Sequence, residues 1–214
     1  MKLDRIDFVD NDSCFFCNHK LATKIAYIFI MEDGTEIQSG PECAKKHSIV
    51  KDVPNLTKGS LEKKQGAETT ESRKKSNLEV FNEKYTKEVE YLILRCDRLS
   101  DFYDIDYEPL MKIYDKYIQN SLDQNDYIYL KNIVNKADRE YSKYGYKNLM
   151  ACYAAKHHIN LWIKNEFDNT FAQGIYDYLR KNYFLTEKQI VAANNWIRNV
   201  SKVSQIEGKW FYKK

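Results

Sequence analysis

The sequence has few of the residues that interrupt regular structure, with only 7 glycines and 3 prolines among 214 residues. This scarcity predicts long helices rather than a turn-rich β fold. No segment approaches the roughly 18 consecutive apolar residues of a membrane span, and the N-terminal residues lack the apolar core of a signal peptide. We therefore expect a soluble, cytoplasmic protein with no membrane partner.

The sequence also lacks the motifs of several enzyme classes. It contains no glycine-rich phosphate loop of the Walker type, and no His-x-Glu motif precedes its cysteines, which excludes the zinc deaminases. We therefore predict that the protein is not an enzyme. The content of 43% hydrophobic and 30% charged residues is typical of a globular protein, and the net charge of +3 permits a polyanionic partner without requiring one.

The five cysteines include a Cys-x2-Cys pair, and this odd number and spacing favour a metal site in a reducing compartment over disulfides. Cys14 and Cys17 form the pair, and Cys43 and His47 follow with Cys-x3-His spacing. Three thiolates and one imidazole form a closed, structural zinc site. We predict one structural Zn2+ on Cys14, Cys17, Cys43 and His47. His19 is a rival fourth ligand, and buried thiols with an incidental histidine are the alternative without metal.

The residues between the expected ligands predict a β-hairpin and a helix. Ala26–Met31 is a short apolar run that favours a strand, Asp33-Gly34 is a hairpin turn signal, and Thr35–Gln38 is the return strand. Pro41 favours a helix start after the hairpin, which places Cys43 and the following histidine one turn apart on one face.

A tight turn with two cysteines, a hairpin and a helix with two further ligands resembles the treble-clef zinc fingers of phage and bacterial proteins. The resemblance covers residues 1–54 and implies fold and metal but not function, because such fingers bind nucleic acids, bind proteins or brace a fold. Some treble-clef nucleases carry a catalytic histidine on the hairpin, and residues 27–38 contain none. This absence also argues against an enzyme.

Basic residues are frequent in and after the expected finger. Residues 55–77 predict a polar, basic linker in which Leu56 and Leu61 are the only large apolar residues. We predict that these basic side chains contact nucleic-acid phosphates: Lys20, Lys24, Lys45, Lys46, Lys63, Lys64, Arg73, Lys74 and Lys75. Phe15, Phe16 and Tyr27 could stack on bases. The alternative, which we favour, is that Phe16 and Tyr27 fill the small core of the finger.

Residues 78–214 carry apolar side chains at steps of three and four, which predicts an all-α domain and a fold that is mainly α. Asp123 is the expected cap of a helix whose buried stripe comprises Tyr127, Leu130, Val134 and Ala137. Leu149–Ile163 is apolar on most faces and is placed at the centre of the domain, and Thr186 starts the last long helix with a capping box.

The helical domain contains an internal echo that suggests two duplicated helical hairpins. Ile113-Tyr114-Asp115 returns as Ile175-Tyr176-Asp177, and each copy precedes a capped turn and a second helix. Any two amphipathic helices can produce such an echo, so chance similarity is the alternative. Residues 165–200 also resemble, over a short length, the helical tails of phage and bacterial DNA-metabolism proteins.

An acidic, aromatic segment at residues 101–108 lacks the glycine and the ligand spacing of a calcium loop. We predict a solvated acidic surface, which could mimic nucleic-acid phosphate or contact a basic protein. A protein partner is supported because tyrosine is a favoured residue of binding hot spots. The candidate contacts are Asp101, Tyr103, Asp104, Asp106 and Tyr107.

Together these patterns favour a non-enzymatic, zinc-containing nucleic-acid-binding or regulatory protein. By resemblance we expect it to be phage or bacterial and to act in the cytoplasm of a bacterial cell or a phage-infected host. The alternative is a protein-interaction module with a purely structural finger, such as a phage factor that inhibits or redirects a host protein. An enzyme with its site in the helical domain is a third, weaker hypothesis.

Overall fold

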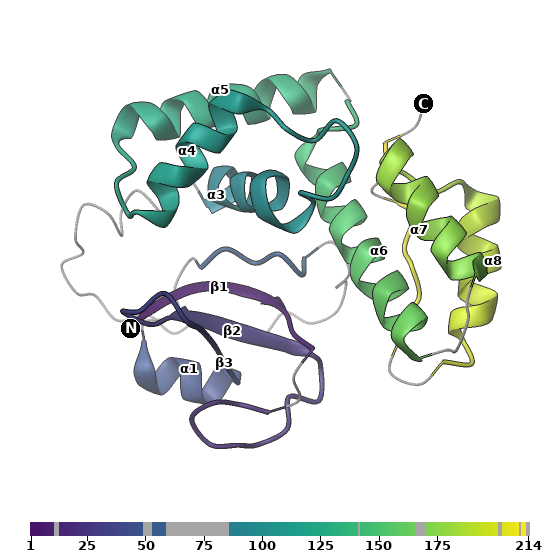
Figure 1. The fold of residues 1–214 in the computed structure, drawn as a ribbon, viewed down its shortest axis with the longest axis horizontal. Helices are drawn as coiled ribbons and strands as arrows, with labels where there is room; N and C mark the ends of the chain where they lie inside the picture. The colour runs from purple at the N-terminus through teal and green to yellow at the C-terminus, as the bar shows by residue number, and fades with distance from the viewer. Residues whose placement is uncertain are drawn as a thin grey trace. The chain divides into compact units, whose positions relative to one another are not determined.

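The structure is a computed structural model that describes residues 1–10, 13–48, 53–58, 86–140, 142–165, 170–200, 203–209 and 211–212. The chain divides into two compact units, Met1–Glu90 and Tyr91–Lys214. It is mainly helical, with a small antiparallel sheet near the N-terminus (Figure 1). The fold class predicted from the sequence is confirmed at this level. No helix among the described residues has the length and apolar character needed to cross a bilayer.

The N-terminal unit contains a three-stranded sheet in the order β1 (Lys2–Phe8), β2 (Ile25–Ile30) and β3 (Glu36–Ser39). The predicted hairpin is β2–β3, and its bounds differ from the prediction by one residue. The turn is formed as expected, because Gly34 adopts a φ of 84° and the backbone N–H of Thr35 donates to Asp33 Oδ1 over 2.9 Å. A positive φ of this kind is readily available to glycine.

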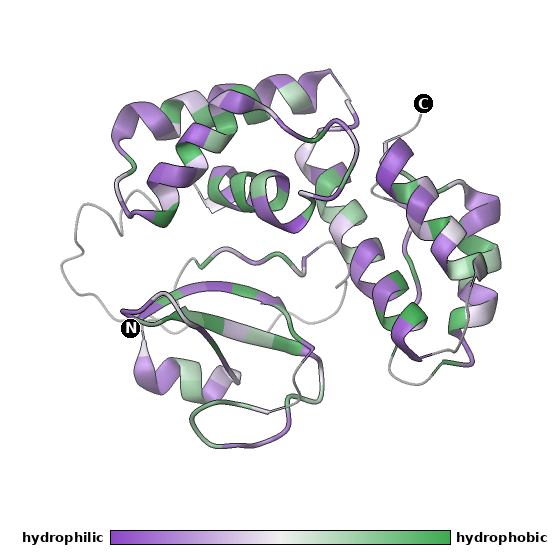
Figure 2. Ribbon diagram, in the orientation of Figure 1, coloured by the Kyte–Doolittle hydropathy of each residue, from purple (hydrophilic) through white to green (hydrophobic). Residues whose placement is uncertain are grey.

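The first strand was not predicted, because its buried positions hold charges instead of apolar residues. Arg5 and Asp7 are 4% and 1% exposed, and Figure 2 shows hydrophilic residues on β1 beside the more hydrophobic β2. Arg5 donates to Asp4 Oδ2, to Asp7 Oδ2 and to both carboxylate oxygens of Glu36, over 2.7–3.0 Å. Burial opposes the guanidinium charge, but the hydrogen bond to Glu36 and the charges of Asp7 and Asp4 prevail and raise the pKa of Arg5.

Helix α1 (Pro41–His47) follows the sheet and begins with Pro41 in its first turn, as predicted. It contributes Ala44 to a small core with Phe29 and Ile37. The first residues of the predicted linker also belong to this unit. The backbone N–H of Leu56 donates to the Ile6 carbonyl over 3.0 Å, and the Leu56 side chain is fully buried. Residues 59–77 of the linker lie outside the described residues.

The C-terminal unit is helical. Its elements are the end of α3 (Thr86–Ile93), the π-helix η1 (Leu94–Arg98), α4 (Glu108–Ile118), α5 (Gln124–Arg139), α6 (Tyr146–Asn165), α7 (Thr170–Asn182) and α8 (Glu187–Ile197). Asp123 and Thr186 both form capping boxes, so both predicted helix starts are confirmed. The first part of the helix expected from Leu78 lies outside the described residues.

The apolar stripes of this unit lie where the sequence places them. The four residues predicted to be buried on α5, which are Tyr127, Leu130, Val134 and Ala137, are all buried. Helix α6 is buried on most faces and contributes the fully buried Trp162. The α4–α5 and α7–α8 pairs each consist of a helix, a capped turn and a second helix, and a duplication that would explain this remains a prediction.

Candidate metal centre

The turn that carries Cys14 and Cys17, which we call the knuckle, is held by backbone hydrogen bonds. Cys14 N–H donates to the His19 carbonyl over 2.9 Å, and Asn18 N–H donates to the Cys14 carbonyl over 2.8 Å. Asn18 adopts a φ of 56°, a left-handed conformation that asparagine tolerates. The knuckle is joined to β3 because Phe15 N–H donates to the Gln38 carbonyl over 2.8 Å.

The structure brings three of the predicted ligands together. The Sγ atoms of Cys14, Cys17 and Cys43 lie within 4.8 Å of one another, close enough to bind a single metal ion. Two come from the knuckle and the third comes from α1, so the cluster brings these two segments together. All five cysteines are free thiols, and none is joined in a disulfide.

The thiols of the cluster differ in acidity. Burial would raise the pKa of Cys14, but hydrogen bonds from the backbone N–H groups of Gly40, Cys17 and Phe16 stabilise the thiolate and lower the pKa to about 6. Sharing of a hydrogen bond with Cys17, together with burial, raises the pKa of Cys43 to about 11. A bound cation favours the thiolate form of all three, because the thiolate is the form that ligates a metal.

The two remaining cysteines lie outside this cluster. The sequence predicts Cys96 and Cys152 as buried, apolar-type side chains, and they are 8% and 0% exposed. Burial raises the pKa of Cys96 to about 12, and it also raises the pKa of Cys152. Both thiols therefore stay protonated and unreactive at neutral pH.

Neither His47 nor His19, the two candidate fourth ligands, belongs to the group of mutually close ligand atoms that the described residues form. The His47 ring lies on α1 and stacks on Phe16, with ring centroids 3.9 Å apart and an interplanar angle of 12°. His19 is exposed beyond the knuckle. The fourth ligand, and the choice between these histidines, therefore stay predictions.

The structure separates the aromatic side chains near the cluster into two kinds. Phe16 and Tyr27 pack against the small core of Phe29, Ile37 and Ala44, as the favoured interpretation of the sequence holds. Phe15, between the two knuckle cysteines, is 61% exposed.

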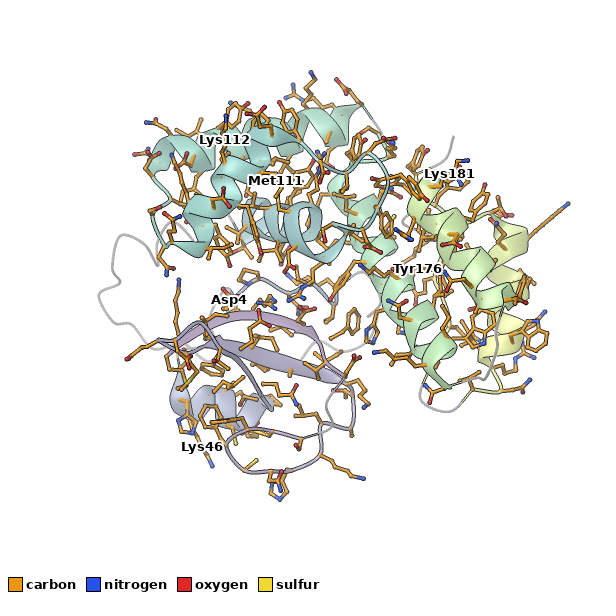
Figure 3. All side chains as sticks on the ribbon, viewed as in Figure 1. Asp4, Lys46, Met111, Lys112, Tyr176 and Lys181 are labelled. Atoms are coloured by element: carbon orange, nitrogen blue, oxygen red, sulfur yellow. The ribbon has the colours of Figure 1, made fainter. Side chains whose placement is uncertain are left out.

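The predicted phosphate contacts of the finger are mostly at the surface. Lys20, Lys45 and Lys46 are exposed, and Lys46 projects from α1 (Figure 3). Lys45 pairs with Glu42 over 3.2 Å, and half-buried Lys24 donates to the Asp10 carbonyl over 3.1 Å. The remaining predicted contacts lie outside the described residues: Lys63, Lys64, Arg73, Lys74 and Lys75.

The acidic segment 101–108 is divided between interior and surface. The Asp101 carboxylate accepts hydrogen bonds from Lys156 Nζ and from the hydroxyl of Tyr176, each over 2.5 Å. Tyr176 lies on α7 (Figure 3). Burial would raise the pKa of Asp101, but these two hydrogen bonds prevail and lower it. The other predicted partner contacts, which are Tyr103, Asp104, Asp106 and Tyr107, are exposed.

The backbone of this segment is held by four side chains that sequence reasoning missed. Arg180 donates to the Asp101 carbonyl over 2.7 and 2.9 Å, and three further carbonyls accept hydrogen bonds over 2.5–2.6 Å. These pairs are Tyr183 with Tyr103, Tyr144 with Asp104, and Arg95 with Ile105. Three of the four donors lie about 40 to 80 residues away in sequence, so no local pattern indicates them.

The geometry thus identifies a three-thiol cluster able to hold a metal and exposed lysines in the same unit. It also identifies residues 101–108, whose backbone is held by four side chains and which we call the constrained loop. Comparison of the chain with protein-family models, with curated proteins and with solved structures finds no match.

Proposed function

We propose that residues 1–54 form a treble-clef finger around one structural Zn2+. The observation that carries this proposal is the convergence of the Cys14, Cys17 and Cys43 sulfurs to within 4.8 Å of one another. The order of knuckle, β2–β3 hairpin and α1 supports the treble-clef assignment. Thiolate-rich sites of this kind suit zinc.

His47 is our proposed fourth ligand, because it follows Cys43 by one turn of α1. A site with three thiolates and one imidazole is closed and has no position for a catalytic water, so the proposed role of the ion is structural. We therefore propose a protein that is not an enzyme.

Elemental analysis of protein purified without added metal tests this proposal. We expect one zinc per chain, with loss of zinc in Cys43→Ala and retention in the matched control Cys96→Ala. We expect His47→Ala to weaken zinc retention against a chelator and His19→Ala to leave it unchanged. Protein without zinc would refute the metal site. If His19→Ala weakens zinc retention and His47→Ala does not, the fourth ligand is His19 instead of His47.

We further propose that the finger binds nucleic acid through phosphate contacts. Exposed Lys20 and Lys46 form no ion pair with any residue that the structure describes. Residues 13–31, which include the knuckle and β2, contain two lysines and no acidic residue, so this segment has an excess of positive charge. Phosphate contacts release counterions, and the affinity therefore falls steeply with salt concentration.

A salt series with oligonucleotide probes tests the nucleic-acid proposal. Lys46→Ala should weaken binding about equally for all sequences and reduce the log–log salt slope by roughly one. Lys112→Ala is the matched control, because this exposed lysine of α4 is paired with Glu108 over 2.7 Å (Figure 3). Binding that no salt concentration alters, or no binding at low salt, would refute the proposal.

The constrained loop supports a second candidate function, which is docking of a protein partner. Four hydrogen-bonded carbonyls hold the segment while Tyr103 and Tyr107 remain 56% and 41% exposed. A surface ordered before binding loses less entropy in a complex. Affinity capture from bacterial extract should retain a protein that Tyr103→Ala with Tyr107→Ala loses and that Lys46→Ala keeps. Equal retention by all variants would argue against this candidate.

A further inference from the structure

The knuckle exposes one apolar ring, that of Phe15, to solvent. Among the described residues of the N-terminal unit, Met1 and Phe15 are the only exposed large hydrophobic residues. Phe15 is 61% exposed. Its neighbour Phe16 fills the core, so the packing of the finger does not need a second ring at this position.

The position of Phe15 is fixed by backbone hydrogen bonds and by contact of its ring with Phe16. Its backbone N–H donates to the Gln38 carbonyl over 2.8 Å, and the Gln38 amide donates back to the Ser13 carbonyl over 2.8 Å. The ring meets Phe16 edge-on, at 5.5 Å and 88°. Phe16 in turn meets fully buried Phe29 at 5.6 Å and 84°. A braced ring loses little conformational freedom when a planar group stacks on it.

The chain segment that carries this ring also carries positive charge. Lys20 pairs with Ser13 in an isolated antiparallel bridge, which places it across the strand from the residues that lead into the knuckle. Neither Lys20 nor Lys46 has an ion pair among the described residues, and no acidic residue occurs between positions 13 and 31. An exposed aromatic ring on a lysine-bearing segment matches the chemistry that binds single strands, where phosphates meet lysines and bases stack on rings.

We infer that the knuckle binds single-stranded nucleic acid, with Phe15 as the platform on which one base stacks. This inference rests on the proposed nucleic-acid function and names its substrate class. Bases of a duplex are stacked on one another and offer no face to a protein ring, whereas an unpaired strand does. The preference for a single strand therefore comes from Phe15, and the salt-sensitive part of the affinity comes from the lysines.

Fluorescence anisotropy with a short single-stranded DNA, the matching RNA and a duplex of equal length tests the inference. We expect the single strands to bind more tightly than the duplex. Phe15→Ala and Phe15→Leu should weaken single-strand binding by about 10-fold, while Phe15→Trp keeps it, because stacking needs a ring. The salt slope should not change, since no charge is removed. Trp196→Ala is the control, because this residue of α8 is similarly exposed at 55%.

The outcomes separate the inference from the function on which it rests. If Phe15→Leu binds the single strand as well as the parent does, or if the parent prefers duplex, the inference is overturned. The phosphate-contact proposal then stands as long as Lys46→Ala still weakens binding. If no probe binds at low salt, both fail. Zinc content is measured for each variant. If Phe15→Ala loses zinc, the inference is tested by comparing single-strand binding of Phe15→Leu with that of Phe15→Trp.

Discussion

The two units of the molecule are stabilised by different means. The C-terminal unit buries large side chains such as Trp162, Tyr91 and Tyr183, each at most 2% exposed. The N-terminal unit buries a few small groups of apolar residues and also encloses the charged Arg5 and Asp7. A small unit with a modest core commonly depends on a metal or another cross-link for stability. The three-thiol cluster, which could hold a metal ion, therefore lies in the unit that has the smaller core.

The cysteines show the same difference within one chain. Backbone N–H groups around Cys14 lower its pKa to about 6, whereas burial among apolar groups raises the pKa of Cys96 to about 12. A thiolate at neutral pH suits a metal ligand, and a protonated thiol suits an apolar core. The same side chain is thus suited to metal binding in one unit and to packing in the other.

Removal of metal should have the largest effect, and it should unfold the N-terminal unit while the C-terminal unit stays folded. We expect chelation to unfold the N-terminal unit, because structural zinc contributes on the order of 10 kcal/mol to folding. All three tryptophans lie at positions 162–210, so tryptophan fluorescence reports on the C-terminal unit and should stay unchanged. Amide hydrogen exchange over residues 25–47 should become fast. Slow amide exchange over these residues after complete zinc removal would show that the N-terminal unit does not depend on metal for its stability.

A core substitution should produce the reverse pattern. Leu130→Ala removes a fully buried side chain from the stripe of α5 and should destabilise the C-terminal unit by about 2–5 kcal/mol. Urea unfolding followed by tryptophan fluorescence measures the loss, and zinc content should stay at the parental value. The control is Ile128→Ala on the same helix, where the side chain is 43% exposed and the expected cost is small. Equal costs for the two variants would contradict the packing described here.

The ion pair of Asp101 should make an intermediate contribution that depends on pH. Asp101→Asn weakens the contacts with Lys156 and Tyr176 and should cost about 1–2 kcal/mol, because Asp101 is partly solvated. The folded pKa of Asp101 is lowered, so its contribution is present above the unfolded pKa and is lost as pH falls through the folded pKa. The difference in unfolding free energy between parent and variant should therefore shrink in acid. A difference that does not vary with pH would argue against this ion pair.

Two glycine substitutions should give the smallest effects, with opposite signs in the two units. Gly34 has a φ of 84° and open space around it, so Gly34→Ala should cost about 1 kcal/mol through backbone strain alone. Gly174 lies inside α7, also with open space, so Gly174→Ala should stabilise that unit by about 0.5–1 kcal/mol. Thermal unfolding of each unit measures both shifts. Shifts of equal sign would show that one of the two backbone assignments is wrong.

Predictions from the sequence were accurate where the determining residues are close together. The Asp33-Gly34 turn, the caps at Asp123 and Thr186 and the buried stripe of α5 each depend on residues within a few positions, and each is formed. Strand β1 was missed because its buried Arg5 is compensated by Glu36, which is 31 positions away. A charged residue on a strand usually indicates an exposed position, and only the distant partner reverses that expectation.

The mainly helical class, the spacing of the three clustered cysteines and the local signals that start and stop the elements can all be derived from the order of the amino acids. Only the tertiary structure decided which side chains remain available to a ligand. It packs Phe16 against the core and leaves Phe15 exposed in the same turn. It also engages the Asp101 carboxylate through the hydroxyl of Tyr176, 75 positions away. The physical reason is that a helix start or a turn is decided by hydrogen bonds between near neighbours. Exposure is decided instead by whatever distant groups pack against a residue once the chain has folded.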